Sequence, residues 1–296
     1  MVFPFFVAIK SLVTKLNFTT MARISTLFSL LVILALGVSS CTQDSVNPDE
    51  VVGQDVIAKV YKLGFSPKDI KKIPEGYLVE RDIILTEELL NSSPAEQRVP
   101  NMEQYRTTNL VNATLYPEIT MYAQQGTCQT CYSAGMIAGL DEAIRRYNAE
   151  NLSIRFRRVT SATGANITMV RLSKSQERQG VLGSAGFPTA AGAPYNQIKM
   201  SGVLESSYGL STAGIATIIA HEMGHCIGMR HTDYYNRAIS CGGAVSNEGD
   251  GGVGAILIPG TPSTATASAK SWMLACTDGG DRPFNADDKT ALNYLY

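Results

Sequence analysis

The chain of 296 residues contains three histidines, and all of them lie within one stretch of eleven residues, HEMGHCIGMRH. Residues four apart on a helix face the same side, so His221 and His225 can direct their imidazoles toward one point. Glu222 follows the first histidine and can reach a water molecule at that point. Two histidines and a glutamate in this HExxH spacing indicate metal-assisted hydrolysis, with Glu222 as the catalytic base.

The next residues extend the pattern. Glycine tolerates a positive φ, so Gly228 can end the helix and turn the chain back, and His231 then approaches the same centre from another direction. Three imidazoles suit a single Zn²⁺ ion, and three protein ligands leave a fourth position for water, as in catalytic zinc sites. Cys226 points elsewhere on the helix, and we expect it to pack or to form a disulfide.

Around this motif the sequence predicts an α+β domain. An amphipathic helix is expected over residues 133–150, and a helix over residues 211–228 contains the motif, with Ser211 or Thr212 as its N-cap. A last short helix follows Asn285. Strands are expected within residues 112–124, 152–160, 166–173 and 195–201.

The part of the chain before this domain is too small to be an enzyme by itself. We assign residues 41–104 to a tether and a small pro- or docking segment, and residues 105–296 to the catalytic domain. Within the first segment, the apolar spacing predicts a helix over residues 49–65 and a strand over residues 77–86. A proline-punctuated linker, residues 91–101, follows.

The N-terminus resembles an export signal. Residues 1–40 are predicted to be a signal peptide whose true start is Met21. The alternative is that residues 1–20 are a genuine extension. The apolar run 27–38 is too short to span a membrane. It ends in VSSC, which resembles a bacterial lipobox, so Cys41 is the predicted lipidation site. We therefore expect a lipoprotein on the cell envelope or surface, or a secreted protein if Cys41 is not lipidated.

The other cysteines suit an exported protein. Cys128 and Cys131 form a CxxC, for which a local disulfide or two free thiols is more plausible than redox function. A disulfide between Cys241 and Cys276 is chemically sensible, although Cys226 is a competing partner. The sequence contains 25 basic and 26 acidic residues without a basic run, which argues against a nucleic-acid partner. The Gly-rich stretch from Asn247 is expected to be a flexible loop rather than a calcium site.

HEMGHCIGMRH matches every fixed position of HExxHxxGxxH, and its continuation His231-Thr232-Asp233 resembles the M57 (HEIGH-motif) group of metzincin metallopeptidases. The resemblance covers residues 105–296. It implies a metzincin-like zincin domain, with a mixed twisted sheet and two long helices that include the active-site helix. It also implies a largely irregular C-terminal subdomain closed by a short helix.

The same resemblance assigns Met273, in Ser271-Trp272-Met273, to the methionine turn beneath the metal. Ala275 stands where some metzincins have an additional tyrosine ligand, so we assign no such ligand. Residues 42–105 contain no cysteine, which excludes a cysteine-based latency switch and leaves inhibition by another group open. Asp233, after the last histidine, is either a residue that orients this ligand or its turn, or a solvated loop acid.

The leading hypothesis is a zinc endopeptidase that cleaves protein or peptide substrates. We expect it to be monomeric and to reach a membrane only through its lipid anchor. The strand near Gln197–Ser201 is a candidate sheet edge for binding substrate backbone. The alternative is a surface binding lipoprotein or adhesin with a non-catalytic zinc site, and hydrolysis of a substrate other than protein is a narrower alternative.

Overall fold

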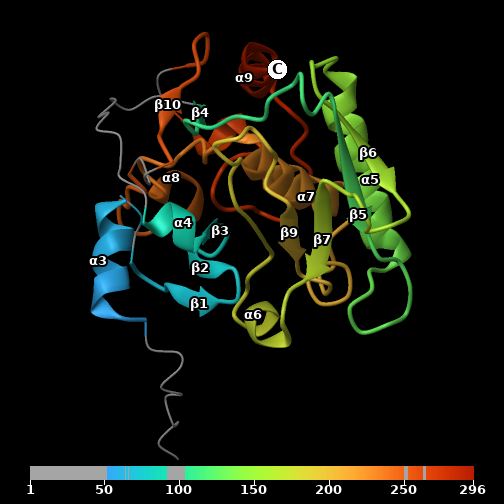
Figure 1. Ribbon diagram of the computed structural model, residues 1–296, viewed down its shortest axis with the longest axis horizontal. Helices are drawn as coiled ribbons and strands as arrows, with labels where there is room; N and C mark the ends of the chain where they lie inside the picture. The colour runs from blue at the N-terminus through green and yellow to red at the C-terminus, as the bar shows by residue number, and fades with distance from the viewer. Residues whose placement is uncertain (1–51, 64, 66, 92–103, 250–252, 263–264) are drawn as a thin grey trace, which may run out of the picture. The chain divides into compact units, whose positions relative to one another are not determined.

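The computed structural model describes residues 52–63, 65, 67–91, 104–249, 253–262 and 265–296 (Figure 1). The predicted signal peptide and Cys41 lie outside these residues. In the described part of the chain, no helix combines the length and the apolar character that a membrane span needs.

Helix α7, Thr212–Ile227, contains the first two histidines, and its ends have the predicted chemistry. The Ser211 side chain accepts a hydrogen bond from the Gly214 N–H at the N-terminus. At the C-terminus, Gly228 has φ 107°, and its N–H donates to the carbonyls of Gly224 and His225. Both predicted cap assignments are confirmed.

A mixed sheet of eight strands supports this helix, and its strand order is β1-β2-β3-β8-β9-β7-β5-β6. Strands β5, β6, β7 and β9 are parallel neighbours, whereas β8 is antiparallel to β9. The strands of this half are β5 (Glu118–Ala123), β6 (Arg155–Val159), β7 (Ile167–Arg171), β8 (Gly183–Ala185) and β9 (Gln197–Met200). Because β9 lies between β8 and β7, it is not a sheet edge, and the expectation that substrate binds along Gln197–Ser201 is wrong.

Helix α5, Ala134–Ala149, packs closely against α7. A Cβ at Gly139 would lie 2.5 Å from Cγ2 of Ile215, so only glycine permits this approach of the two helices. The predicted apolar face of α5 is buried along its length. At its end, the Tyr147 hydroxyl donates to the Ala220 carbonyl at 2.8 Å, which fixes α5 against the middle of α7.

The N-terminal segment supplies the other three strands of the sheet. Its elements are α3 (Gln54–Lys62), β1 (Lys71–Ile73), β2 (Gly76–Val79), β3 (Ile83–Leu85) and α4 (Glu87–Leu90). Strands β1, β2 and β3 are consecutive antiparallel neighbours, and β3 joins β8 in parallel. In Figure 1 these elements lie on the side of α7 opposite to β5, β6 and α5.

The structure corrects the prediction of one strand over residues 77–86. The chain turns between β2 and β3, where Val79 pairs with Ile83. Glu80 and Arg81 in this turn have φ values of 55° and 79°. Positive φ costs a non-glycine residue roughly 1–2 kcal/mol, so the surrounding contacts must hold this turn in place. Both strands are buried on both faces, which places the hairpin between two hydrophobic clusters.

The chain after α7 is mostly irregular, as expected. Its elements are α8 (Ala238–Cys241), β10 (Ile256–Leu257), η3 (Ala267–Ala269) and α9 (Ala286–Leu295). Strand β10 pairs with β4 (Tyr105–Arg106), and α6 (Lys174–Arg178) connects β7 to β8. Asn285 and Asp288 form a capping box at the start of α9, which confirms the prediction that a helix follows Asn285.

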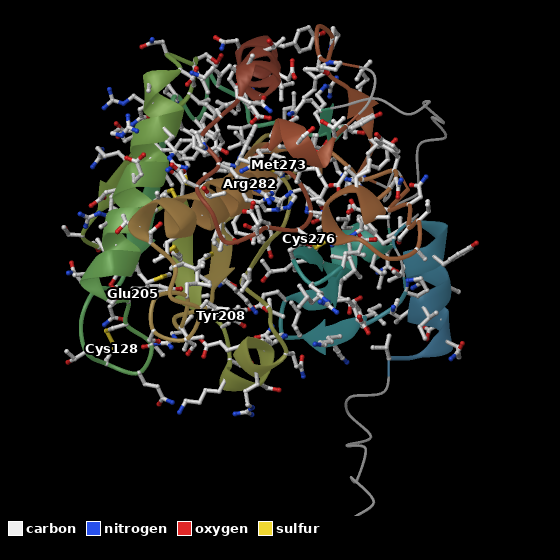
Figure 2. All side chains as sticks on the ribbon, turned by 180° about the vertical axis from the view of Figure 1, so that it is seen from behind. Cys128, Glu205, Tyr208, Met273, Cys276 and Arg282 are labelled. Carbon is white, nitrogen blue, oxygen red and sulfur yellow. A yellow bond between two sulfur atoms is a disulfide. The ribbon has the colours of Figure 1, made fainter. Side chains whose placement is uncertain are left out.

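Disulfides join Cys241 to Cys276 and Cys128 to Cys131. Cys226 is a free thiol buried on α7. Of the two expected roles, it therefore packs in the core and does not form a disulfide. In Figure 2, Cys128 lies well away from Met273 and Cys276.

Candidate metal centre

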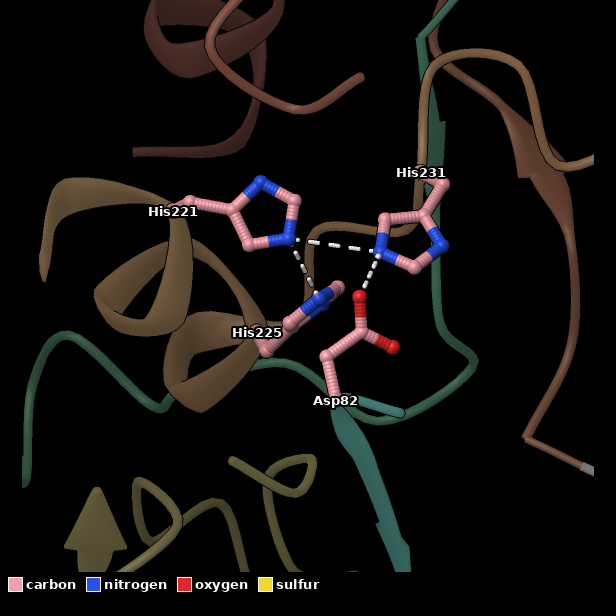
Figure 3. Close-up of side chains that lie close together, drawn as sticks. All are labelled: Asp82, His221, His225 and His231. Carbon is pink, nitrogen blue, oxygen red and sulfur yellow. Dashed lines mark hydrogen bonds and ion pairs between the residues drawn. The ribbon is translucent and has the colours of Figure 1, made fainter. Parts of the chain in front are cut away.

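The three histidines converge on one point (Figure 3). The Nε2 atom of His221 lies 3.1 Å from Nε2 of His225 and 3.3 Å from Nε2 of His231. His225 and His231 are fully buried, and His221 is 8% exposed. After the Gly228 turn, the Arg230 N–H donates to the Tyr105 carbonyl at 2.8 Å, which leads the third histidine back toward the helix.

The other ring nitrogen of each histidine has an acceptor as its partner. Nδ1 of His221 lies 2.8 Å from the Trp272 carbonyl, and Nδ1 of His225 lies 2.9 Å from the Met229 carbonyl. A carbonyl only accepts hydrogen bonds, so each Nδ1 must have the proton. In the neutral ring, Nε2 then presents a lone pair. Two lone pairs that face each other repel, so the contact between Nε2 of His221 and Nε2 of His225 is not a hydrogen bond, and a cation between these rings would remove the repulsion.

The spacing of these donors fits a metal ion. Tetrahedral Zn²⁺ binds imidazole nitrogen at about 2.0–2.1 Å, which separates two ligand nitrogens by about 3.3–3.4 Å. The two Nε2–Nε2 distances, 3.1 and 3.3 Å, are close to that value. Burial lowers the pKa of His221 to about 4, so its imidazole is neutral and able to bind a metal at neutral pH.

Asp82 is a fourth donor at this point, and the sequence analysis did not identify it. Its Oδ2 lies 3.1 Å from Nε2 of His231, and its side chain is 13% exposed. Ligand atoms of Asp82 and the three histidines all lie within 4.8 Å of one another. The turn between β2 and β3 places Asp82 here. The three charged residues Glu80-Arg81-Asp82 between two short apolar runs are the sequence signal that could have shown this turn.

Glu248 holds His231 from its other side and was also missed. Its Oε1 accepts a hydrogen bond from Nδ1 of His231 at 2.6 Å and another from Arg237 at 2.7 Å. Burial alone would lower the pKa of His231, but the carboxylates of Glu248 and Asp82 outweigh it and raise this pKa to about 10. Both carboxylates therefore favour positive charge at His231, which either a proton or a metal ion on Nε2 can supply.

Glu222 is buried beside the histidines. Within the described residues, its Oε2 has no hydrogen-bond partner. Burial, and secondarily the charge of Asp82, raises the pKa of this carboxyl. A Cβ at Gly183 would lie 2.4 Å from Oε1 of Glu222, so strand β8 runs directly beside this carboxylate. Glu222 and His221 line a pocket of about 170 Å³.

The two remaining predicted site residues lie beneath and behind the histidines. A Cβ at Gly224 would lie 2.5 Å from Sδ of Met273, so the buried methionine packs directly on α7. The Asp233 carboxylate accepts hydrogen bonds from the Ser240 hydroxyl at 2.6 Å and from the Ala275 N–H at 2.9 Å. Asp233 therefore joins the turn after His231 to the chain that follows Met273, and it is buried rather than solvated.

Comparison with known proteins agrees with this geometry. The model of the family described as dual-action HEIGH metallopeptidases matches residues 77–296. One matching solved structure is titled "Crystal structure of myroilysin"; it is 14% identical, with 73% of this chain and 98% of that chain covered and a TM-score of 0.35, values too low to support a structural argument. A search of curated proteins finds no match. The family match spans more than half of the chain, so this protein is a metallopeptidase and belongs to the M57 (HEIGH) family.

Proposed function

We propose that the protein is a zinc-dependent endopeptidase in which His221, His225 and His231 bind the metal and Glu222 is the general base. The observation that supports this proposal is the convergence of the three Nε2 atoms, beside a buried carboxylate oxygen that has no hydrogen-bond partner among the described residues. Zinc, when bound, supplies Lewis acidity toward a water molecule and a peptide carbonyl.

Residues of the protein then transfer protons or fix their positions. Glu222 takes a proton from the attacking water, because its raised pKa makes it a stronger base than a solvated carboxylate. The same carboxyl, now protonated, delivers that proton to the leaving nitrogen of the peptide bond. Trp272 and Met229 keep the imidazoles of His221 and His225 in one tautomer through their carbonyls, so that Nε2 stays free of protons.

Replacement of Glu222 by Gln tests the role of the base. We expect cleavage of an unfolded polypeptide by the zinc-loaded chain from residue 42 onward to fall about 100-fold or more, because general-base catalysis typically supplies at least that factor. Zinc content, measured in the same samples, is expected to stay unchanged. The comparison is made with and without Asp82→Asn, since the Asp82 carboxylate lies 3.1 Å from His231 Nε2.

The exposed Glu205 offers a matched control. It accepts a hydrogen bond from Ser133, and Figure 2 shows it well away from Met273, so Glu205→Gln should cleave at the parent rate. Equal rates in Glu222→Gln and its parent would contradict the assignment of the base. The alternative of a binding protein with a purely structural metal is disfavoured, because the family is one of peptidases and structural zinc has no need of a buried carboxylate base.

We further propose that the chain is exported and anchored through a lipid on Cys41. The support is the sequence alone: a short apolar run that ends in VSSC, followed by a polar tether. In a bacterium that processes lipoproteins, we expect a labelled fatty acid to be incorporated into the wild type, which should sediment with membranes. Cys41→Ser should lose both properties, and label retained by that variant would contradict lipidation at this residue.

A further inference from the structure

Asp82 contacts the side of His231 that faces the other two histidines. An acid that only orients a metal-binding histidine bonds to the ring nitrogen that points away from the metal. Glu248 already occupies that position, with its Oε1 2.6 Å from Nδ1. Asp82 Oδ2 instead lies 3.1 Å from Nε2, the atom that faces His221 (Figure 3). Its position is therefore that of a fourth ligand and not of a second orienting acid.

The surrounding residues hold Asp82 in this position. Arg237 donates to the Glu80 carboxylate at 3.0 Å and to the Glu80 carbonyl at 3.3 Å. The same arginine donates to Glu248 at 2.7 Å, so it joins the hairpin turn to the residue that orients His231. These contacts offset the positive φ of Glu80 and Arg81. The other oxygen of Asp82, Oδ1, is buried and has no hydrogen-bond partner among the described residues.

Strand β3 also occupies the position where substrate backbone would bind. The Ala185 N–H of β8 donates to the Asp82 carbonyl at 2.9 Å. Strand β8 runs beside Glu222, and its other neighbour is β9. Without β3, β8 would be a sheet edge next to the catalytic base, which is where an extended peptide adds as a further strand. The β2–β3 hairpin thus covers the substrate edge and the metal site together.

We propose that Asp82 is a fourth metal ligand of this chain, held there by the β2–β3 hairpin, and that the protein is latent until Asp82 leaves the site. The inference rests on the proposed endopeptidase function and specifies how that activity is regulated. A carboxylate at the fourth position excludes both the water and the peptide carbonyl that the reaction needs. The same segment is the one predicted from the sequence to be a pro- or docking segment.

The test uses the full chain loaded with Co²⁺, whose visible absorption reports its ligands. The variants are Asp82→Asn and Asp82→Ala, with Asp55→Asn as the matched control. Asp55 lies in the same segment, in the first turn of α3, and is exposed. Three properties are measured for each protein: the cobalt spectrum, the affinity for acetohydroxamate, and the rate of cleavage of an unfolded polypeptide by the zinc form.

We expect both Asp82 variants to change the cobalt spectrum. They should bind acetohydroxamate at least about tenfold more tightly. In the wild type only a minor fraction of molecules has the fourth metal position free, whereas in the variants this position is free in most molecules. Cleavage should rise by a similar factor, and Asp55→Asn should behave as the wild type in all three measurements. Added acetate, but not chloride, should restore the wild-type spectrum of Asp82→Ala, which a purely structural role of Asp82 would not produce.

Wild-type spectra and acetohydroxamate affinities in both Asp82 variants would overturn the ligand assignment. An altered spectrum with a wild-type rate of cleavage would overturn the latency. If the spectrum and affinity change while no variant cleaves the polypeptide, Asp82 is a ligand and the endopeptidase proposal is what fails. If Asp82→Ala does not fold, the more conservative Asp82→Asn decides between these outcomes.

Discussion

At His231, two carboxylates bind opposite nitrogens of one imidazole, and their positions give them different roles. Glu248 is fully buried and accepts from Nδ1, so it sets the ring's tautomer and orientation. Asp82 lies on the Nε2 side, where we propose that the metal binds. At the scale of single residues, the proposed centre is thus a three-histidine site with one acid that orients a ligand and one that closes the site.

Replacement of Glu248 by Gln tests the orienting role. An amide at this position weakens the hydrogen bond from Nδ1 and removes the negative charge that balances the half-buried Arg237 and the buried Arg230. We expect zinc affinity to fall about 10- to 100-fold, the usual effect of losing such a partner. Competition with a chelator of known affinity measures this loss. Glu205→Gln serves again as the control, and an unchanged zinc affinity of Glu248→Gln would contradict the role.

At the scale of elements, the turn that ends α7 decides whether the third histidine reaches the first two. Gly228 has φ 107°, and a Cβ there would lie 2.7 Å from Cδ2 of Leu110 and 3.0 Å from Oγ1 of Thr107. Glycine is thus needed for both conformation and space. The turn, together with the close packing of α7 on α5, brings the three histidines of one short sequence motif to the same point.

Replacement of Gly228 by Ala should therefore destabilise the fold and displace His231. We expect the free energy of unfolding to fall by about 2–5 kcal/mol, the sum of a left-handed backbone penalty and a steric clash. Denaturant unfolding measures the change. Gly164 is the matched control, because its φ is 79° and nothing lies within 4 Å of its Cβ position. Gly164→Ala should cost only about 1–2 kcal/mol, and equal losses in the two variants would show that the space at Gly228 is unimportant.

At the scale of the whole molecule, the mixed sheet, the two long helices and the irregular C-terminal part form the metzincin-like fold of a zinc peptidase family. The irregular part has few backbone hydrogen bonds of regular secondary structure to stabilise it. The disulfide between Cys241 and Cys276 supplements them, and Cys276 lines the same pocket as His221 and Glu222. This bridge therefore stabilises one wall of the site.

Removal of this disulfide, by replacing Cys241 and Cys276 with Ser, should lower the free energy of unfolding by about 3–4 kcal/mol, because the bridge closes a loop with a sequence separation of 35. Cleavage activity should fall as well, because the bridge holds a wall of the pocket. The control is the Cys128–Cys131 pair, whose separation is 3; its loss should cost on the order of 1–2 kcal/mol and leave activity intact. Thermal and denaturant unfolding measure the two losses, and a larger loss at Cys128–Cys131 would refute this account.

The sequence by itself determined the residues that are local to one helix and its turn. His221, Glu222 and His225 follow from the helical repeat, and the place of His231 follows from the tolerance of glycine for positive φ. The caps at Ser211 and Asn285 are equally local, because a capping side chain bonds to the backbone of its own first turn.

Only the tertiary structure decided which distant segments meet at the three histidines. Asp82 and Glu248 approach His231 through strand pairing and loop packing, and no spacing along the chain encodes such contacts. For the same reason β9 was mistaken for a sheet edge: alternation of side chains shows that a segment is a strand but not which strands flank it. The local sequence thus specified the chemistry of the site, whereas the approach of Asp82 to it depends on contacts between segments that are far apart along the chain.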